Sequence, residues 1–229
     1  MLPLILSILL ASCSGHAAGV AADSLRLDGR QLDFRGKKVE EKDLASLSAP
    51  RFRDVDTVLL ARADLEPEAL AHLRSIPVTT LDLAFTSVGD DHLAALRGLA
   101  ISSLDLTATG VGDPSARLLA SLPLDTLRLG STEIGDRAAE AVRELPLRRL
   151  DLQRTRITDA VAPSLARMHR LENLNLSHTS IGDTTVEALL ELENLRWLGL
   201  METRASAAAI ARLQSARPEL QIQVELPTR

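Results

Sequence analysis

The side chains that could carry chemistry in this sequence recur at regular intervals, and the most regular are five aspartates. They follow one another at spacings of 23 or 24 residues: Asp90, Asp113, Asp136, Asp159 and Asp183. A calcium site takes about 6 to 8 oxygen ligands, and one carboxylate per interval supplies too few. Each aspartate precedes a segment whose apolar residues have helical spacing. We therefore expect each one to be a helix N-cap that accepts a backbone N–H at the positive end of the helix dipole.

Histidine and cysteine give no indication of a catalytic or metal site. The histidines share no position of the repeating pattern, so it brings no two of them together: His16, His72, His92, His169 and His178. Metal sites need several such ligands to converge. The sequence contains no Gly-x-Ser-x-Gly nucleophile motif and no phosphate-binding glycine loop. We predict a protein that is not an enzyme and holds no metal or cofactor.

The aspartates belong to a repeated phrase, Leu-x-Leu-x-x-Thr-x-Val/Ile-Gly/Thr-Asp. Clear copies start at Leu81, Leu104, Leu127, Leu150 and Leu174, and the phrase decays at Leu198. Weaker copies start at Leu32 and Val58, which makes eight units. A fixed period of this size indicates a solenoid, in which each unit buries its apolar face only by stacking on its neighbours.

Each unit combines a strand with a helix. The opening Leu-x-Leu alternates with period two, which suits a short strand. The second half places apolar residues at every third position, as in Leu93, Leu96 and Leu99, and this spacing keeps them on one helical face. We expect the strands of successive units to lie parallel, with the helices covering the outer side.

Composition agrees with one elongated α/β domain. The units occupy nearly all of the 229 residues and leave no room for a second core. Aromatic residues make up only 2% of the chain, so leucine and alanine must fill the interior. The net charge of −5 is mild and spread along the sequence, which argues against a nucleic-acid partner.

The units resemble the leucine-rich repeat family. The pattern from Leu171 to Asp183 is similar to the threonine-containing repeats of bacterial members. These repeats in turn resemble those of the ribonuclease-inhibitor horseshoe. The resemblance covers residues 32–229. It implies an α/β leucine-rich repeat solenoid, a right-handed horseshoe segment of about eight repeats, with parallel strands on the concave face and helices on the convex face. It also implies that the recurring threonines turn inward as a structural ladder: Thr86, Thr109, Thr132, Thr155, Thr179 and Thr203.

The two ends of such a stack need caps, because an open end exposes apolar side chains and an unpaired strand edge. At residues 24–31, Asp28-Gly29 lies between alternating apolar segments and predicts a β-hairpin. The repeats then occupy residues 32–217. Residues 218–229 begin with an alternating segment, Pro218 to Glu225, which we interpret as a C-terminal cap strand.

The N-terminal segment resembles the export signal of bacterial lipoproteins. Its apolar run is too short to span a bilayer but fits a secretion signal. Leu10-Ala11-Ser12-Cys13 is similar to the lipobox, whose cysteine receives a lipid. The resemblance implies a signal peptide at residues 1–12, lipidation of Cys13, a tether at residues 13–23 and a membrane anchor. Ser14, directly after the cysteine, resembles the outer-membrane signal of enterobacterial lipoproteins. The alternative is an ordinary secreted protein with a cysteine in its leader.

Two features of the expected concave face could bind a partner. One is a charged group of side chains on neighbouring strands: Asp82, Asp105, Arg128, Asp151, Arg149 and Arg154. It could hold a charged partner, or it could be a self-neutralising surface ladder that contributes little to stability. The other is Trp197 with Met201, a large apolar pair that is either an interface anchor or part of the C-terminal cap.

Together these features predict a lipid-anchored envelope protein that acts as a non-catalytic interaction module. Its partner would be another protein or a cell-envelope polymer, bound at the concave face. The alternative is a structural spacer or self-associating surface element without a discrete ligand. Capture of a saturable partner separates the two hypotheses.

Overall fold

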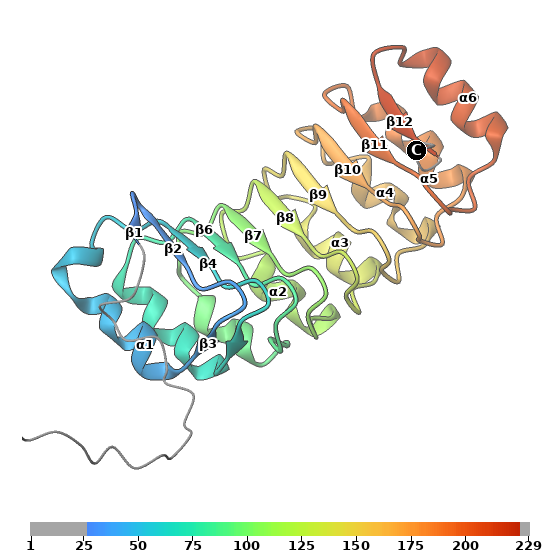
Figure 1. Ribbon diagram of the computed structural model, residues 1–229. Coiled ribbons are helices and arrows are strands. Elements are labelled where there is room, and N and C mark those ends of the chain that lie inside the picture. The colour runs from blue at the N-terminus through green and yellow to red at the C-terminus, as the bar shows by residue number, and fades with distance from the viewer. Residues whose placement is uncertain (1–26, 225–229) are drawn as a thin grey trace, which may run out of the picture.

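The computed structural model describes residues 27–224 of the chain. The predicted signal peptide and tether, Cys13, residues 24–26 of the predicted hairpin and residues 225–229 of the predicted cap lie outside the described residues. Within 27–224, strand-turn-helix units stack side by side in a curved row, with strands along one face and helices along the other (Figure 1). No helix in this range has the length and apolarity needed to cross a bilayer.

One sheet runs through the whole stack, and the described residues contribute ten strands to it. From β2 onward all neighbours are parallel, and the repeat phrases pair in register, so that Leu81 pairs with Leu104 and Leu104 with Leu127. The predicted α/β leucine-rich repeat solenoid is therefore confirmed. Its parallel strands are β2 (Gln31–Asp33), β4 (Thr57–Leu59), β6 (Thr80–Asp82), β7 (Ser103–Asp105), β8 (Thr126–Arg128), β9 (Arg149–Asp151), β10 (Asn173–Asn175), β11 (Trp197–Gly199) and β12 (Gln221–Gln223).

The two edges of the sheet differ. At the N-terminal edge, β1 (Leu27–Asp28) turns back on β2 as an antiparallel hairpin, and Gly29 has the positive φ of +64° that this turn requires. At the C-terminal edge, β12 pairs parallel with β11 as one more strand of the stack. It begins only at Gln221 because the preceding residues form a turn, closed by the Leu220 N–H donating to the Arg217 carbonyl.

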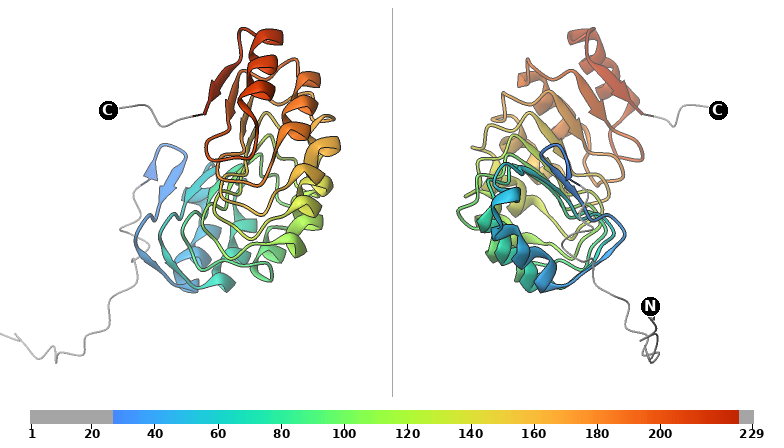
Figure 2. Two further views of the ribbon diagram at one scale, coloured as in Figure 1. Left: turned by 90° about the vertical axis from the view of Figure 1, so that its right-hand side faces the viewer. Right: turned by 60° about the vertical axis from the view of Figure 1, so that its left-hand side comes forward.

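Short helices connect the strands and follow the outer side of the curve (Figure 2). A unit of about 23 residues leaves room for only one or two helical turns, and several units use 3₁₀ segments, which suit short pieces. A second, two-stranded ladder joins β3 (Lys38–Val39) to β5 (Asp64–Leu65). The helical segments are α1 (Glu41–Ala45), η2 (Ser46–Ser48), η3 (Pro50–Phe52), η4 (Pro67–Ser75), η5 (His92–Leu96), η6 (Asp113–Ser115), α2 (Ala116–Leu119), α3 (Asp136–Val142), η7 (Asp159–Val161), α4 (Ala162–Leu165), α5 (Asp183–Ala188), η8 (Leu189–Glu191) and α6 (Ala207–Ala216).

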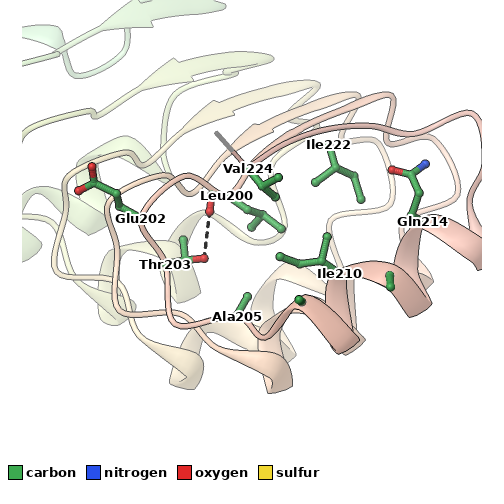
Figure 3. Close-up of a pocket in the computed structure, with 10 residues that line it drawn as sticks. Leu200, Glu202, Thr203, Ala205, Ile210, Gln214, Ile222 and Val224 are labelled. Carbon is green, nitrogen blue, oxygen red and sulfur yellow. Dashed lines mark hydrogen bonds between the residues drawn. The ribbon is translucent and has the colours of Figure 1, made fainter. Parts of the chain in front are cut away.

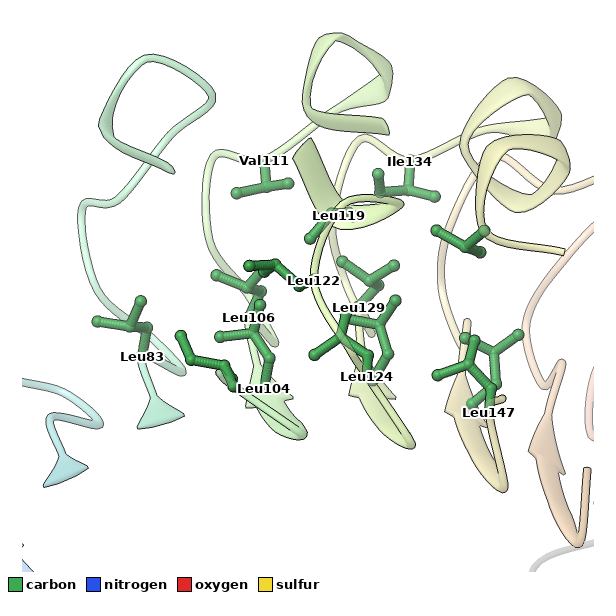
Figure 4. Packing of buried hydrophobic residues seen from close by; sticks show 14 of the residues in the cluster. Leu83, Leu104, Leu106, Val111, Leu119, Leu122, Leu124, Leu129, Ile134 and Leu147 are labelled. Carbon is green, nitrogen blue, oxygen red and sulfur yellow. The ribbon is translucent and has the colours of Figure 1, made fainter. Parts of the chain in front are cut away.

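The core is a set of columns in which equivalent residues of successive units lie against one another. Leu83, Leu106 and Leu129 follow one another behind the sheet, with Val111 and Ile134 deeper in the stack (Figure 4). All five are at most 1% exposed. Burying one such side chain stabilises the fold by about 1.5–3 kcal/mol, so the regular leucine spacing provides most of the driving force for stacking.

A left-handed residue follows the strand in each unit, and the sequence analysis did not predict it. The φ angles lie between 49° and 66° at Gly36, Arg62, Phe85, Ala108, Ser131, Arg154, His178 and Glu202. This conformation directs the backbone N–H to the next unit, as where Ala108 donates to the Gly130 carbonyl at 2.8 Å. A residue other than glycine pays about 1–2 kcal/mol for this geometry, which the inter-repeat hydrogen bond helps to offset.

The recurring threonines stand immediately after these left-handed residues. Each hydroxyl donates to the backbone carbonyl three residues earlier in its own unit, as Thr109 does to Leu106 at 2.7 Å. The oxygen–oxygen distances range from 2.6 to 3.0 Å for Thr86, Thr109, Thr132, Thr155, Thr179 and Thr203. In the first unit Lys37 replaces threonine, and its Nζ donates to the Asp33 carbonyl.

Candidate functional site

The five recurring aspartates join neighbouring units, and the prediction that they are N-caps was wrong. The N-cap is the preceding residue, Gly112, Gly135, Thr158 or Gly182, and Asp90 lies outside its helix. Each carboxylate accepts a backbone N–H from the following unit instead, at 2.6–2.9 Å. The pairs are Gly112 to Asp90, Gly135 to Asp113, Thr158 to Asp136, Gly182 to Asp159 and Ser206 to Asp183. We call these aspartates the inter-repeat column.

Glycine precedes most of these aspartates because the carboxylate of the previous unit needs the space. Gly182 has an extended φ of −129°, which any residue adopts, but a Cβ there would lie 2.9 Å from Asp159 Oδ2. Where threonine or serine stands in place of this glycine, its hydroxyl donates a hydrogen bond to the carboxylate of the previous unit. Thr158 donates to Asp136 and Ser206 to Asp183 through their Oγ atoms.

Asp159 makes the most extensive contact of the inter-repeat column. Its Oδ1 accepts the backbone N–H of Gly182 at 2.8 Å and both the N–H and the hydroxyl of Thr185, at 3.1 and 2.6 Å. Thr185 is completely buried. Burial alone would raise the pKa of Asp159, but these hydrogen bonds outweigh it and lower the pKa below its usual value.

In the unit that starts at Leu81, His92 provides the acceptor that an aspartate of the preceding unit provides elsewhere. The equivalent position of that preceding unit is Pro67. The Gly89 N–H donates to His92 Nδ1 at 2.9 Å, within the same unit. The structure thus gives this histidine a structural role. Among residues 27–224 no group of three or more His, Cys, Asp or Glu side chains could hold a metal ion.

The concave face contains an open hollow of about 250 Å³ over β8, β9, β10 and β11. We call it the concave hollow. It brings together the centre of the predicted charged group and the predicted tryptophan, which lie on different units. Its polar and aromatic lining is Arg128, Arg149, Asp151, Asn173, Asn175 and Trp197.

Four of the eight predicted partner-binding residues therefore share one site. Asp105 borders it through an ion pair in which its Oδ2 lies 3.4 Å from Arg128. Asp82 lies on β6, further along the sheet. Arg154 occupies a left-handed turn position, and neither it nor Met201 lines the hollow. Asn173 and Asn175 were not singled out from the sequence, although their positions beside the Leu-x-Leu core placed them on this face.

The acidic residues of the concave face are held by their own backbone. In Asp82, Asp105 and Asp151, Oδ1 accepts the N–H two residues later, at 2.9–3.0 Å. Burial is the main cause that raises the pKa of Asp82 and of Asp151 above the usual value, and the charge of Asp105 adds to it. We call these three the concave column.

Trp197 lies against a glycine on its own strand. A Cβ at Gly199 would approach Trp197 Cη2 to 2.9 Å and Asn175 Oδ1 to 2.5 Å. Glycine is therefore required for the indole to lie along the sheet. The ring is half-buried, so one part of it packs on the sheet and the rest faces the concave hollow.

A larger hollow of about 530 Å³ lies at the C-terminal end of the stack. Leu200, Ile210, Ile222 and Val224 border it, beside the hydrogen bond from Thr203 to the Leu200 carbonyl (Figure 3). These side chains continue the core columns. The hollow is where the interior of the stack ends, and its lining is mostly apolar, with Glu202, Thr203 and Gln214 as its polar members.

Comparison with known proteins supports the fold. No protein-family model matches the sequence, and no curated protein matches it. Among solved structures, internalin F of Listeria monocytogenes aligns with a TM-score of 0.63 and 20% identity, over 84% of this chain and 59% of the internalin. Internalin C2 of the same bacterium aligns with a TM-score of 0.55 and 20% identity, over 82% of this chain and 84% of that one. This chain thus spans less than two thirds of internalin F. The two internalins are leucine-rich repeat proteins.

Proposed function

We propose that this chain is a non-catalytic protein-interaction module that binds a protein partner through its concave face. The observation that supports this most is the concave hollow, where a half-buried tryptophan and two arginines lie on one rigid sheet. Tryptophan and arginine are the residues most often found as binding anchors in protein interfaces. Stacked repeats also offer an extended concave surface for a partner, and two internalins share this architecture.

The module would be exported and held at a bacterial membrane by a lipid on Cys13. The support is the lipobox-like sequence Leu10 to Cys13 behind a short apolar run. Stable anchoring needs more than one acyl chain, which lipoprotein modification supplies. Mass spectrometry of the membrane fraction should find acylated Cys13, and the Cys13→Ser variant should move to the soluble fraction. Cleavage at another position would contradict the anchor and leave the binding proposal intact.

Capture from a native membrane extract tests the binding proposal. The wild-type protein should enrich a saturable partner, and Trp197→Ala should weaken capture by about 2 kcal/mol, or roughly thirtyfold. Phe85→Ala is the matched control, because Phe85 is 50% exposed but lies outside the concave hollow. Absence of any saturable partner would instead support a structural spacer. Equal losses for both variants would place the interface elsewhere.

A further inference from the structure

The concave hollow offers unused positive charge. Arg149 is exposed, and its side chain forms no ion pair or hydrogen bond with any of residues 27–224. Arg128 pairs with Asp105 at 3.4 Å, and about half of its side chain remains exposed. A guanidinium has five N–H donors in a planar fork that matches the geometry of a carboxylate. Most donors of these two arginines are therefore available to a ligand.

Each side-chain acceptor of Asp151 and Asn175 in the hollow already has a hydrogen-bond donor. Asp151 is its only carboxylate, and there Oδ1 accepts the Gln153 N–H at 2.9 Å and Oδ2 accepts Gln153 Nε2 at 3.2 Å. Asn175 Oδ1 accepts the Ser177 N–H at 3.1 Å, and the side chain of Asn175 is also hydrogen-bonded to Asp151. Asp105 pairs with Arg128 and Asp151 lies in the hollow, so the guanidinium of the hollow without an ion-pair partner among residues 27–224 is that of Arg149. It is complementary to a negatively charged group that only accepts hydrogen bonds.

We infer that the concave hollow binds the carboxylate of an acidic side chain on the partner protein, between Arg128 and Arg149. The inference rests on the proposed function and adds the chemistry of the contact. The apolar stem of a glutamate would pack against Trp197, which also lines the hollow.

The single tryptophan provides the measurement. The chain contains one Trp and no Tyr, so fluorescence reports on Trp197 alone. The full-length protein should give a saturable fluorescence change with Nα-acetyl-glutamate N-methylamide and a much smaller one with the neutral glutamine analogue. Arg149→Gln should raise the dissociation constant about tenfold, as expected for loss of a charge-assisted hydrogen bond. Arg117→Gln, an exposed residue of α2 on the convex side, should leave it unchanged.

Three results would overturn the inference: equal responses to the two analogues, no response to either, or tighter binding of glucuronate than of the glutamate compound. Thermal unfolding should first show that both arginine variants remain folded. Failure of this inference can be told from failure of the proposed function. If Trp197→Ala still abolishes partner capture while neither analogue binds, the interface is at the hollow but does not recognise a carboxylate.

Discussion

Two columns of aspartates run along this solenoid, and they use their carboxylates differently. The inter-repeat column bonds each unit to the next, as where Asp113 Oδ1 accepts the Gly135 N–H at 2.8 Å. The concave column bonds each aspartate to its own unit, as where Asp105 Oδ1 accepts the Thr107 N–H at 2.9 Å. The first column therefore contributes to stacking. The second leaves carboxylate oxygens on the surface where a partner would bind.

The pKa values of two aspartates in each column move in opposite directions. Hydrogen bonds from the following unit lower the pKa of Asp159 and of Asp183. Burial raises the pKa of Asp82 and of Asp151 on the concave face. A lowered pKa means that folding favours the carboxylate, and a raised pKa means that folding opposes it. Ionised aspartates thus stabilise the fold in the inter-repeat column and destabilise it in the concave column.

The largest difference between the columns should appear when a side chain is removed. Asp159→Ala leaves the buried Thr185 hydroxyl and two backbone N–H groups without their acceptor, and should lower the free energy of unfolding by about 2–4 kcal/mol. Asp105→Ala, the matched control, frees one N–H near water and should cost less than about 1 kcal/mol. Urea denaturation measures both. Similar losses would show that the two columns are energetically equivalent.

A smaller effect should follow from crowding the inter-repeat column. Gly182→Ala places a Cβ 2.9 Å from Asp159 Oδ2, so the carboxylate must shift, and we expect a loss of about 1–2 kcal/mol. Gly112→Ala is the matched control, because its nearest neighbours would lie at 3.6 Å. Since φ at Gly112 is −136°, alanine fits there and should stabilise by about 0.4–1 kcal/mol through the unfolded state. Thermal unfolding of the two variants should therefore shift in opposite directions.

The sequence predicted the features that repeat with a simple period. The Leu-x-Leu spacing predicted the strands, and the parallel register of Leu81 with Leu104 follows from stacking equivalent leucines. It also placed Arg149 and Trp197 on one face. Their meeting in one hollow depends on the curvature of β8 to β11 and on the absence of a side chain at Gly199, which no spacing rule supplies.

The sequence was misleading where a local signal had a non-local partner. An aspartate after glycine at the start of a helical segment has the local pattern of an N-cap, but the carboxylate of Asp113 bonds to Gly135 in the next unit. At the left-handed turns, in contrast, the sequence contains no local signal. Ala108 and Ser131 do not favour positive φ locally, and the hydrogen bonds that direct them there come from neighbouring units.

The smallest expected effect concerns pH and tests both columns together. Asp159 and Asp183 contribute stability above the unfolded-state pKa of about 4, and it is lost as pH falls through their lower folded values. Asp82 and Asp151 act with the opposite sign, since stability rises as pH falls from above their raised pKa values towards about 4.

The variant Asp82→Asn/Asp151→Asn removes the pH-dependent contribution of these two carboxyl groups to stability. Asparagine keeps the Oδ1 acceptor for the backbone N–H, so the fold should persist and gain about 0.5 kcal/mol at pH 7. Denaturation between pH 7 and pH 3 should then lack the rise in stability that Asp82 and Asp151 contribute towards about pH 4. The loss at lower pH remains, because it comes from Asp159 and Asp183 together with the ion-paired Asp33, Glu40 and Glu172. A variant whose stability at pH 7 falls instead would mean that the two carboxylates stabilise the concave face as ion-pair partners of Arg128, and the opposition between the columns would then be wrong.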